Sequence, residues 1–169
     1  MHHTDKYAAR WMKSKAYADY ARVVEETFKR FMTTPVDVFA CLTEARLNEK
    51  NAVCAERSRE TLRLEEPQAD PPAELSSQAV AKYYLQAARM YEAAATYAVL
   101  LGDLCRAFKR FRKAAKCGQR CNELLVCGDP EILAAVKDYR EKTALIRGEI
   151  ARRSVRRRRL TFGLGRRLR

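Results

Sequence analysis

The chain has 169 residues and a formal net charge of +13 at pH 7. This length allows one domain with its own core, or two small helical units. Few glycines and prolines (6 and 5), with Ala, Leu and Val scattered among charged residues, are typical of an all-α protein. The longest uncharged stretch, 93–102, has about half of the roughly 20 residues needed to cross a bilayer, so we expect no transmembrane span.

The N-terminal segment is basic and amphipathic. Five cations precede position 23 against two acids, and mitochondrial presequences have the same character. The two acids, and an apolar pattern that continues to Met32, favour a retained helix over 5–32, and a presequence is the alternative. No apolar core follows the early charges, so we do not expect secretion.

A second helix is expected from the stop and start signals at 33–37. Thr34 is a candidate N-cap and Pro35 is tolerated at the first helical position. This helix should run to about Leu64 and pack back on the first one, forming an N-terminal helical hairpin over 1–66. Three of the five prolines fall in 67–75, which we expect to be an extended linker between two units.

Three further helices are predicted over 76–150. The first begins at Ser76 or Ser77 and ends near Leu101, where Gly102-Asp103 turns the chain. The next covers 104–126, and the turn 128–130 (Gly-Asp-Pro) ends it and starts a helix that runs from 131 to about 150. Residues 151–169 form an Arg-rich tail.

Six cysteines without a secretory signal indicate free thiols in a reducing compartment. One Cys-x9-Cys spacing, Cys117 to Cys127, is a pattern of small disulfide proteins of the mitochondrial intermembrane space, but a second copy is missing. Cys117 and Cys121 share a helical face, yet both histidines lie at the start of the chain. We therefore expect no metal site.

Within 91–114 the sequence resembles a tetratricopeptide-type helical hairpin. Aromatic and small residues occupy the places where that family packs two helices closely around a Gly-acid turn: Tyr91, Ala94, Ala95, Ala98, Gly102-Asp103, Ala107, Phe111 and Ala114. No second copy follows at a 34-residue offset. Taken as three helices, 77–147 also resembles the microtubule-interacting and trafficking domain. Both resemblances imply a TPR-like bundle that holds a partner protein.

The strongest functional feature is the C-terminal charge. Residues 147–169 hold ten arginines and one acid, about +9 of the total of +13, while the remaining 146 residues carry 24 bases against 20 acids. Guanidinium groups bind phosphate oxygens bidentately and stack on bases. We expect an arm that orders on RNA. The alternatives are a solubilising tail, a nuclear import signal, or contact with anionic lipid or an acidic protein.

Two sets of residues are the candidate sites. The helix over 104–126 adds cations with few local acidic partners, a possible second phosphate-binding stripe; its alternative is a solvated helix face. The expected nucleic-acid-binding residues are Arg152, Arg153, Arg156, Arg157, Arg158, Arg159, Arg166, Arg167, Arg169, Lys109, Arg110, Arg112, Lys113 and Lys116. The candidate protein-binding residues, for which core packing is the alternative, are Tyr84, Tyr91, Phe111 and Trp11.

These patterns predict a non-enzymatic component of a large ribonucleoprotein of the organellar-ribosome type. It would bind RNA, expected to be ribosomal, through its arm and neighbouring proteins through its helices, without a cofactor. We expect the mitochondrial matrix in preference to the cytoplasm or nucleus. The alternative is a helical adaptor, or a supernumerary subunit of a mitochondrial membrane complex whose tail touches the membrane surface. A basic face that joins the helix over 104–126 to the tail would favour RNA; an isolated tail beside an apolar groove would favour the adaptor.

Overall fold

The described part of the chain is built from four long helices. The computed structural model describes residues 18, 22, 25, 26, 37–68, 70–125 and 128–165, with 155–165 described by their backbone only. The helices are α3 (Val38–Glu65), α4 (Ser77–Leu100), α5 (Leu104–Leu124) and α6 (Pro130–Gly165), and a short 3-10 helix, η1 (Ala73–Leu75), precedes α4. No strand occurs among these residues, so the predicted all-α class is confirmed. No described helix is both long enough and apolar enough to span a membrane.

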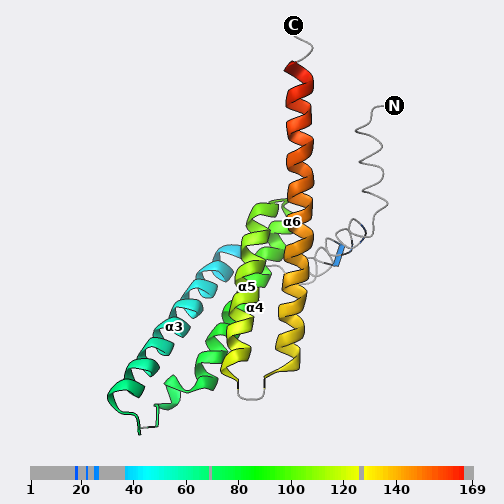
Figure 1. Ribbon diagram of the computed structural model, residues 1–169. Helices are drawn as coiled ribbons and strands as arrows, with labels where there is room; N and C mark the ends of the chain where they lie inside the picture. Colours follow the sequence, from blue (N-terminus) through cyan, green and yellow to red (C-terminus); the bar gives the residue numbers. More distant parts are fainter. Residues whose placement is uncertain are drawn as a thin grey trace.

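Each helix packs mainly against the next one in the chain. Figure 1 shows α3, α4, α5 and α6 side by side in chain order, with the C-terminal part of α6 extending beyond the ends of the other three. The core therefore lies along the α3–α4, α4–α5 and α5–α6 contacts, and the last turns of α6 stand apart from it.

The predicted starts of α4, α5 and α6 are confirmed by their caps. The side chains of Ser76 and Asp103 each accept a hydrogen bond from the backbone N–H three residues later, at 3.2 and 3.0 Å, and Asp129 accepts one from the N–H two residues later at 2.8 Å. Gly102 and Gly128 adopt φ angles of 70° and 63°, the left-handed region that favours glycine. Local turn chemistry thus sets the length of both hairpin connections.

The start of α3 differs from the prediction. Asp37, and not Thr34, is the N-cap, and its Oδ1 accepts a hydrogen bond from the N–H of Ala40 at 3.0 Å. Residues 33–36 lie outside the described part of the chain, as does most of the helix predicted over 5–32, including Trp11. The expected packing between those two helices is therefore not described.

Helix α3 shares its core with α4. Ala45 and Ala52 are completely buried within the same hydrophobic cluster as the α4, α5 and α6 core residues, and Tyr84 of α4 donates a hydrogen bond to Glu56 of α3 at 2.8 Å. The segment 67–75, expected to separate two units, joins two helices that pack on each other. The helix expected to complete an N-terminal hairpin thus belongs to the same packed body as α4–α6.

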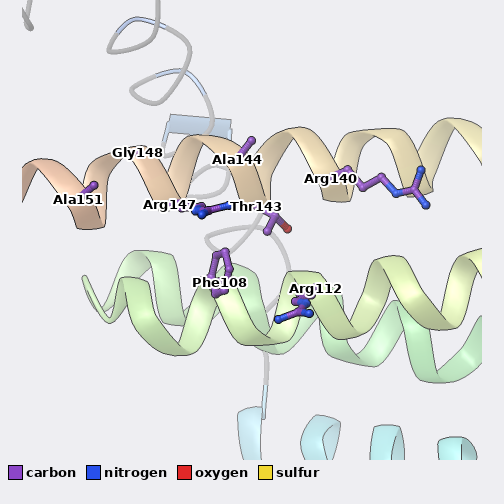
Figure 2. A pocket seen from close by; sticks show the side chains of 8 residues that line it. All are labelled: Phe108, Arg112, Arg140, Thr143, Ala144, Arg147, Gly148 and Ala151. Atoms are coloured by element: carbon purple, nitrogen blue, oxygen red, sulfur yellow. The ribbon is translucent and has the colours of Figure 1, made fainter.

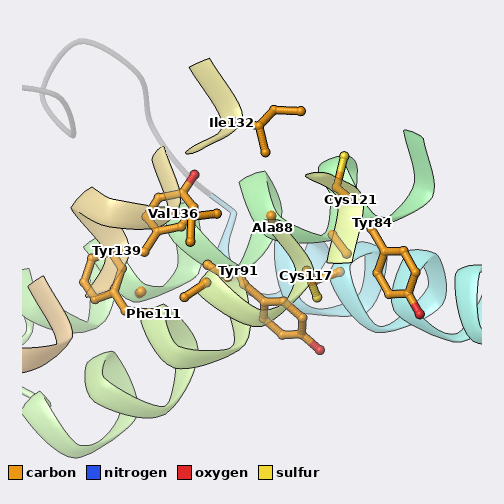
Figure 3. Packing of buried hydrophobic residues seen from close by; sticks show 14 of the residues in the cluster. Tyr84, Ala88, Tyr91, Phe111, Cys117, Cys121, Ile132, Val136 and Tyr139 are labelled. Atoms are coloured by element: carbon orange, nitrogen blue, oxygen red, sulfur yellow. The ribbon is translucent and has the colours of Figure 1, made fainter. Parts of the chain in front are cut away.

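Small residues let α4, α5 and α6 approach closely around a few aromatic rings (Figure 3). The alanines and aromatic residues that carry the tetratricopeptide resemblance are buried here. Tyr84, Tyr91 and Phe111, proposed above as protein-binding residues, have exposures of only 6%, 5% and 0%. Their rings hold the helices together and are not available to a partner.

Helix α6 does not end where the sequence pattern predicted. Its apolar periodicity stops near Ile150, yet the helix continues to Gly165, so residues 151–165 of the predicted Arg-rich tail are helical. Arginine is among the better helix formers, and no proline or glycine interrupts the run before Gly163. The absence of a helix breaker outweighs the loss of an apolar face.

We expect Gly118→Ala to destabilise the protein and Gly148→Ala to stabilise it. A Cβ atom at Gly118 of α5 would lie 2.7 Å from Cγ2 of Val136 in α6, whereas a Cβ atom at Gly148 would meet nothing within 4 Å. The first change should lower the free energy of unfolding by about 1–3 kcal/mol, and the second should raise it by about 0.5–1 kcal/mol. Urea unfolding measures both, and adding Val136→Ala should recover part of the first loss.

Candidate nucleic-acid interface

Two of the predicted α5 cations have partners inside the fold. Lys113 lies with its Nζ 2.6 Å from Oε1 of Glu49 on α3, and Arg110 donates a hydrogen bond to the carbonyl oxygen of Ala94 on α4 at 2.8 Å. Both groups hold α5 against its neighbours. Their phosphate-binding role stays a prediction.

The acids that neutralise this side of α5 come from α3. Glu49 also accepts a hydrogen bond from the hydroxyl of Tyr91 at 2.6 Å. Burial alone would raise the pKa of Glu49, but the hydrogen bonds from Lys113 and Tyr91 outweigh it and lower that pKa. In the same way, Arg120 forms an ion pair with Glu56 at 2.7 Å. These pairs join residues 64 positions apart, so local sequence does not show them.

The other three predicted cations of α5 are exposed to solvent and could contact a phosphate. Lys109, Arg112 and Lys116 are exposed, and their spacing of three and four residues places them on one side of the helix. Within the described part of the chain, none of them forms a hydrogen bond or an ion pair.

Helix α6 contributes two more exposed cations, Arg140 and Arg147, which line one groove together with Arg112 of α5. We call Lys109, Arg112, Lys116, Arg140 and Arg147 the α5–α6 basic strip. The side chain of Arg140 is held by a short hydrogen bond to Gln119 of α5. Arg147 has no ion-pair partner among the described residues.

A groove of about 920 Å³ lies between α5 and α6 within this strip. Figure 2 shows Phe108 projecting from α5 toward α6, with Arg147 and Thr143 opposite it, and Arg112 also lines the groove from α5. The remaining lining residues are Arg140, Ala144, Gly148 and Ala151. Three guanidinium groups and no carboxylate line the groove, so its electrostatic potential favours an anion.

Arg152 and Arg153 begin the Arg-rich part of α6 and already have a partner. Arg152 Nη2 lies 2.5 Å from Oε1 of Glu149, and Arg153 Nε lies 2.9 Å from the same oxygen. Glu149 is only 1% exposed. Burial alone would raise its pKa, but the hydrogen bonds from the two arginines lower it. These two predicted phosphate-binding residues therefore share one carboxylate.

The structure describes only the backbone, or nothing, of the remaining predicted nucleic-acid-binding residues. Helix α6 continues through four of them, Arg156, Arg157, Arg158 and Arg159, for which the structure describes the backbone only. Arg166, Arg167 and Arg169 lie beyond the described residues, as Trp11 does. The two α6 members of the strip, Arg140 and Arg147, thus share one continuous helix with the arginines at 156–159.

Sequence reasoning missed Arg140 and Arg147 as site residues. Helix α5 ends at Leu124 and α6 begins at Pro130, so the two form an antiparallel hairpin in which residues at equal distances from the connection lie side by side. Arg112 therefore faces the stretch 140–147, and the seven-residue spacing of its two arginines keeps them on one face. The turn signal and this spacing together could have located the groove.

Comparison with protein-family models, curated proteins and solved structures finds no match for this chain. The tetratricopeptide and microtubule-interacting resemblances therefore stay predictions from the sequence. Over the described residues, no group of three or more His, Cys, Asp or Glu side chains gathers in a way that could hold a metal ion.

Proposed function

We propose that this chain is a non-enzymatic helical component of a ribonucleoprotein, of the organellar-ribosome type, that binds RNA phosphates along α6. The observation that carries the proposal is the continuity of α6: the helix that lines the basic groove runs on through the Arg-rich segment to Gly165. A basic face joined to the tail is the arrangement that favours RNA over an adaptor role. The groove beside the tail is flanked by arginines, which further favours a polyanion.

The distribution of charge on α5 supports the same proposal. Lys113 and Arg120 are paired with Glu49 and Glu56 of α3, whereas Arg112, which lines the groove beside α6, is exposed and has no ion-pair partner among the described residues. Unpaired cations at the groove can hold a phosphate backbone in a defined orientation.

Removing four charges from the strip should weaken RNA binding more than removing four charges elsewhere. The strip variant replaces Lys109, Arg112, Lys116 and Arg147 with glutamine, and the control variant replaces Lys50, Arg57, Arg63 and Lys82, all exposed on α3 and α4. Both carry a formal charge of +9, that is +13 minus 4. For a single-stranded RNA at low salt, the strip variant should lose about 100-fold in affinity and the control less than about 3-fold. Equal losses would mean that net charge alone drives binding, which would contradict a localised interface.

A further inference from the structure

We propose that the groove between α5 and α6 receives one nucleotide of a single-stranded RNA, with a phosphate between Arg112 and Arg147 and the base against Phe108. The inference rests on the proposed RNA-binding function and adds a strand preference to it. The groove has a volume of about 920 Å³ and is open to solvent, so a base and its sugar-phosphate can reach it from the surface.

The phosphate position follows from charge. Arg112 and Arg147 reach the groove from opposite helices, and within the described part of the chain neither has an ion-pair partner. Two like charges that share one space repel each other, and a bound anion between them replaces that repulsion with two attractions. Guanidinium groups also match phosphate oxygens with paired hydrogen bonds.

The base position follows from the apolar part of the lining. The ring of Phe108 projects from α5 toward α6 and is only partly buried (Figure 2). Ala144, Gly148 and Ala151 of α6 line the same groove, and a Cβ atom at Gly148 would meet nothing within 4 Å. In proteins that bind single strands, unpaired bases stack on accessible aromatic rings such as this one.

The preference for single strands follows from whether a base can reach Phe108. In an A-form duplex the bases are stacked inside the helix, and only phosphates, 2′-hydroxyls and base edges are presented. A duplex can therefore contact the α5–α6 basic strip but cannot place a base against Phe108. The groove should add affinity for single strands and none for duplexes.

To test the inference, a substitution in the full-length chain fills the groove without changing its charge. Gly148→Leu places a side chain in the open space, and Gly148→Ala is the matched control because its methyl group meets nothing within 4 Å. Affinity is measured for a short oligouridylate and for an RNA duplex of equal length at the same salt. Gly148→Leu should weaken oligouridylate binding about 10-fold, Gly148→Ala less than about 2-fold, and neither should change duplex binding. Phe108→Leu, which keeps an apolar side chain but removes the ring, should cause the same selective loss.

Each other outcome overturns the inference in a distinguishable way. If Gly148→Leu and Phe108→Leu leave oligouridylate binding unchanged while both RNAs still bind, the groove holds no base, and the proposed function stands. If uridine monophosphate binds the wild-type chain, is blocked by Gly148→Leu, and oligouridylate is indifferent to that change, the groove serves a free nucleotide and not an RNA strand. If the wild-type chain binds neither RNA, the proposed function and the inference fail together.

Discussion

Replacing Arg156, Arg157, Arg158 and Arg159 together by glutamine should weaken binding to single-stranded RNA about 100-fold at low salt. Each phosphate contact adds an increment that grows as salt is lowered, and four permanent charges are removed at once. Glutamine has nearly the helix propensity of arginine, so α6 should still run past Ile150. The affinity is measured by titration of labelled RNA, and circular dichroism confirms that helix content is unchanged.

The charge-matched control for this variant is the glutamine substitution of Lys50, Arg57, Arg63 and Lys82 described above. It has the same formal charge of +9 and leaves α5 and α6 intact. If the two variants bind RNA equally well, the Arg-rich continuation of α6 is not an RNA-binding element. The search would then move to acidic proteins and anionic lipids as partners of this segment.

Replacing Arg152 and Arg153 together by glutamine should lower the free energy of unfolding by about 3 kcal/mol at pH 7. Both guanidinium groups contact Glu149, and removing them leaves a carboxylate that is 1% exposed without its charged partners. The control Lys109→Gln/Lys116→Gln removes two exposed charges without ion pairs and should change stability by less than about 0.5 kcal/mol. Denaturant unfolding measures both variants. A loss no larger than that of the control would contradict the structural role of the two arginines.

The same pair of substitutions should invert one contribution to the pH dependence of stability. In the wild-type chain the pKa of Glu149 is lowered, so the stability that its ion pairs provide is present above the ordinary carboxyl pKa of about 4.3 and is lost as pH falls through the lowered value. Without the arginines, burial raises the pKa of Glu149, so this residue then favours folding as pH falls. Unfolding curves between neutral and acidic pH for the two proteins show the difference.

This pairing also determines how the C-terminal segment should be removed. A chain that ends at Glu149 loses both arginines that compensate the buried carboxylate, so weak RNA binding by it would combine misfolding with lost phosphate contacts. A chain that ends at Ser154 keeps both ion pairs. It is the suitable truncation for separating the role of the Arg-rich segment in binding from its role in stability.

Where the sequence predicted the fold well, the information was local. Ser76, Asp103 and Asp129 cap helices through side chains that bond to N–H groups two or three residues away, and Gly102 and Gly128 supply the left-handed backbone of the turns. Such interactions are readable from adjacent residues. They are sufficient to predict the starts of α4, α5 and α6.

The prediction was wrong or incomplete for two reasons. Some side chains contact residues far away in the sequence, and the loss of apolar periodicity was interpreted as the end of a helix. The partners of Lys113 and Arg110 lie on other helices, so both appeared to be unpaired cations. The end of α6 was placed at the loss of apolar periodicity, although a helix needs no apolar face where it leaves the core. The groove required the antiparallel alignment of α5 and α6 as well as residue types.

The salt dependence of RNA binding by the intact chain tests the central claim most directly. Contacts from the α5–α6 basic strip and the Arg-rich continuation of α6 predict a steep fall in affinity, with a slope of log affinity against log salt of roughly −0.7 per phosphate on a single strand. Four or more contacts would give a slope of about −3 or steeper, flattened in the variant that lacks the charges of Arg156, Arg157, Arg158 and Arg159. A shallow slope, or no binding at low salt, would contradict an RNA-binding role for this face.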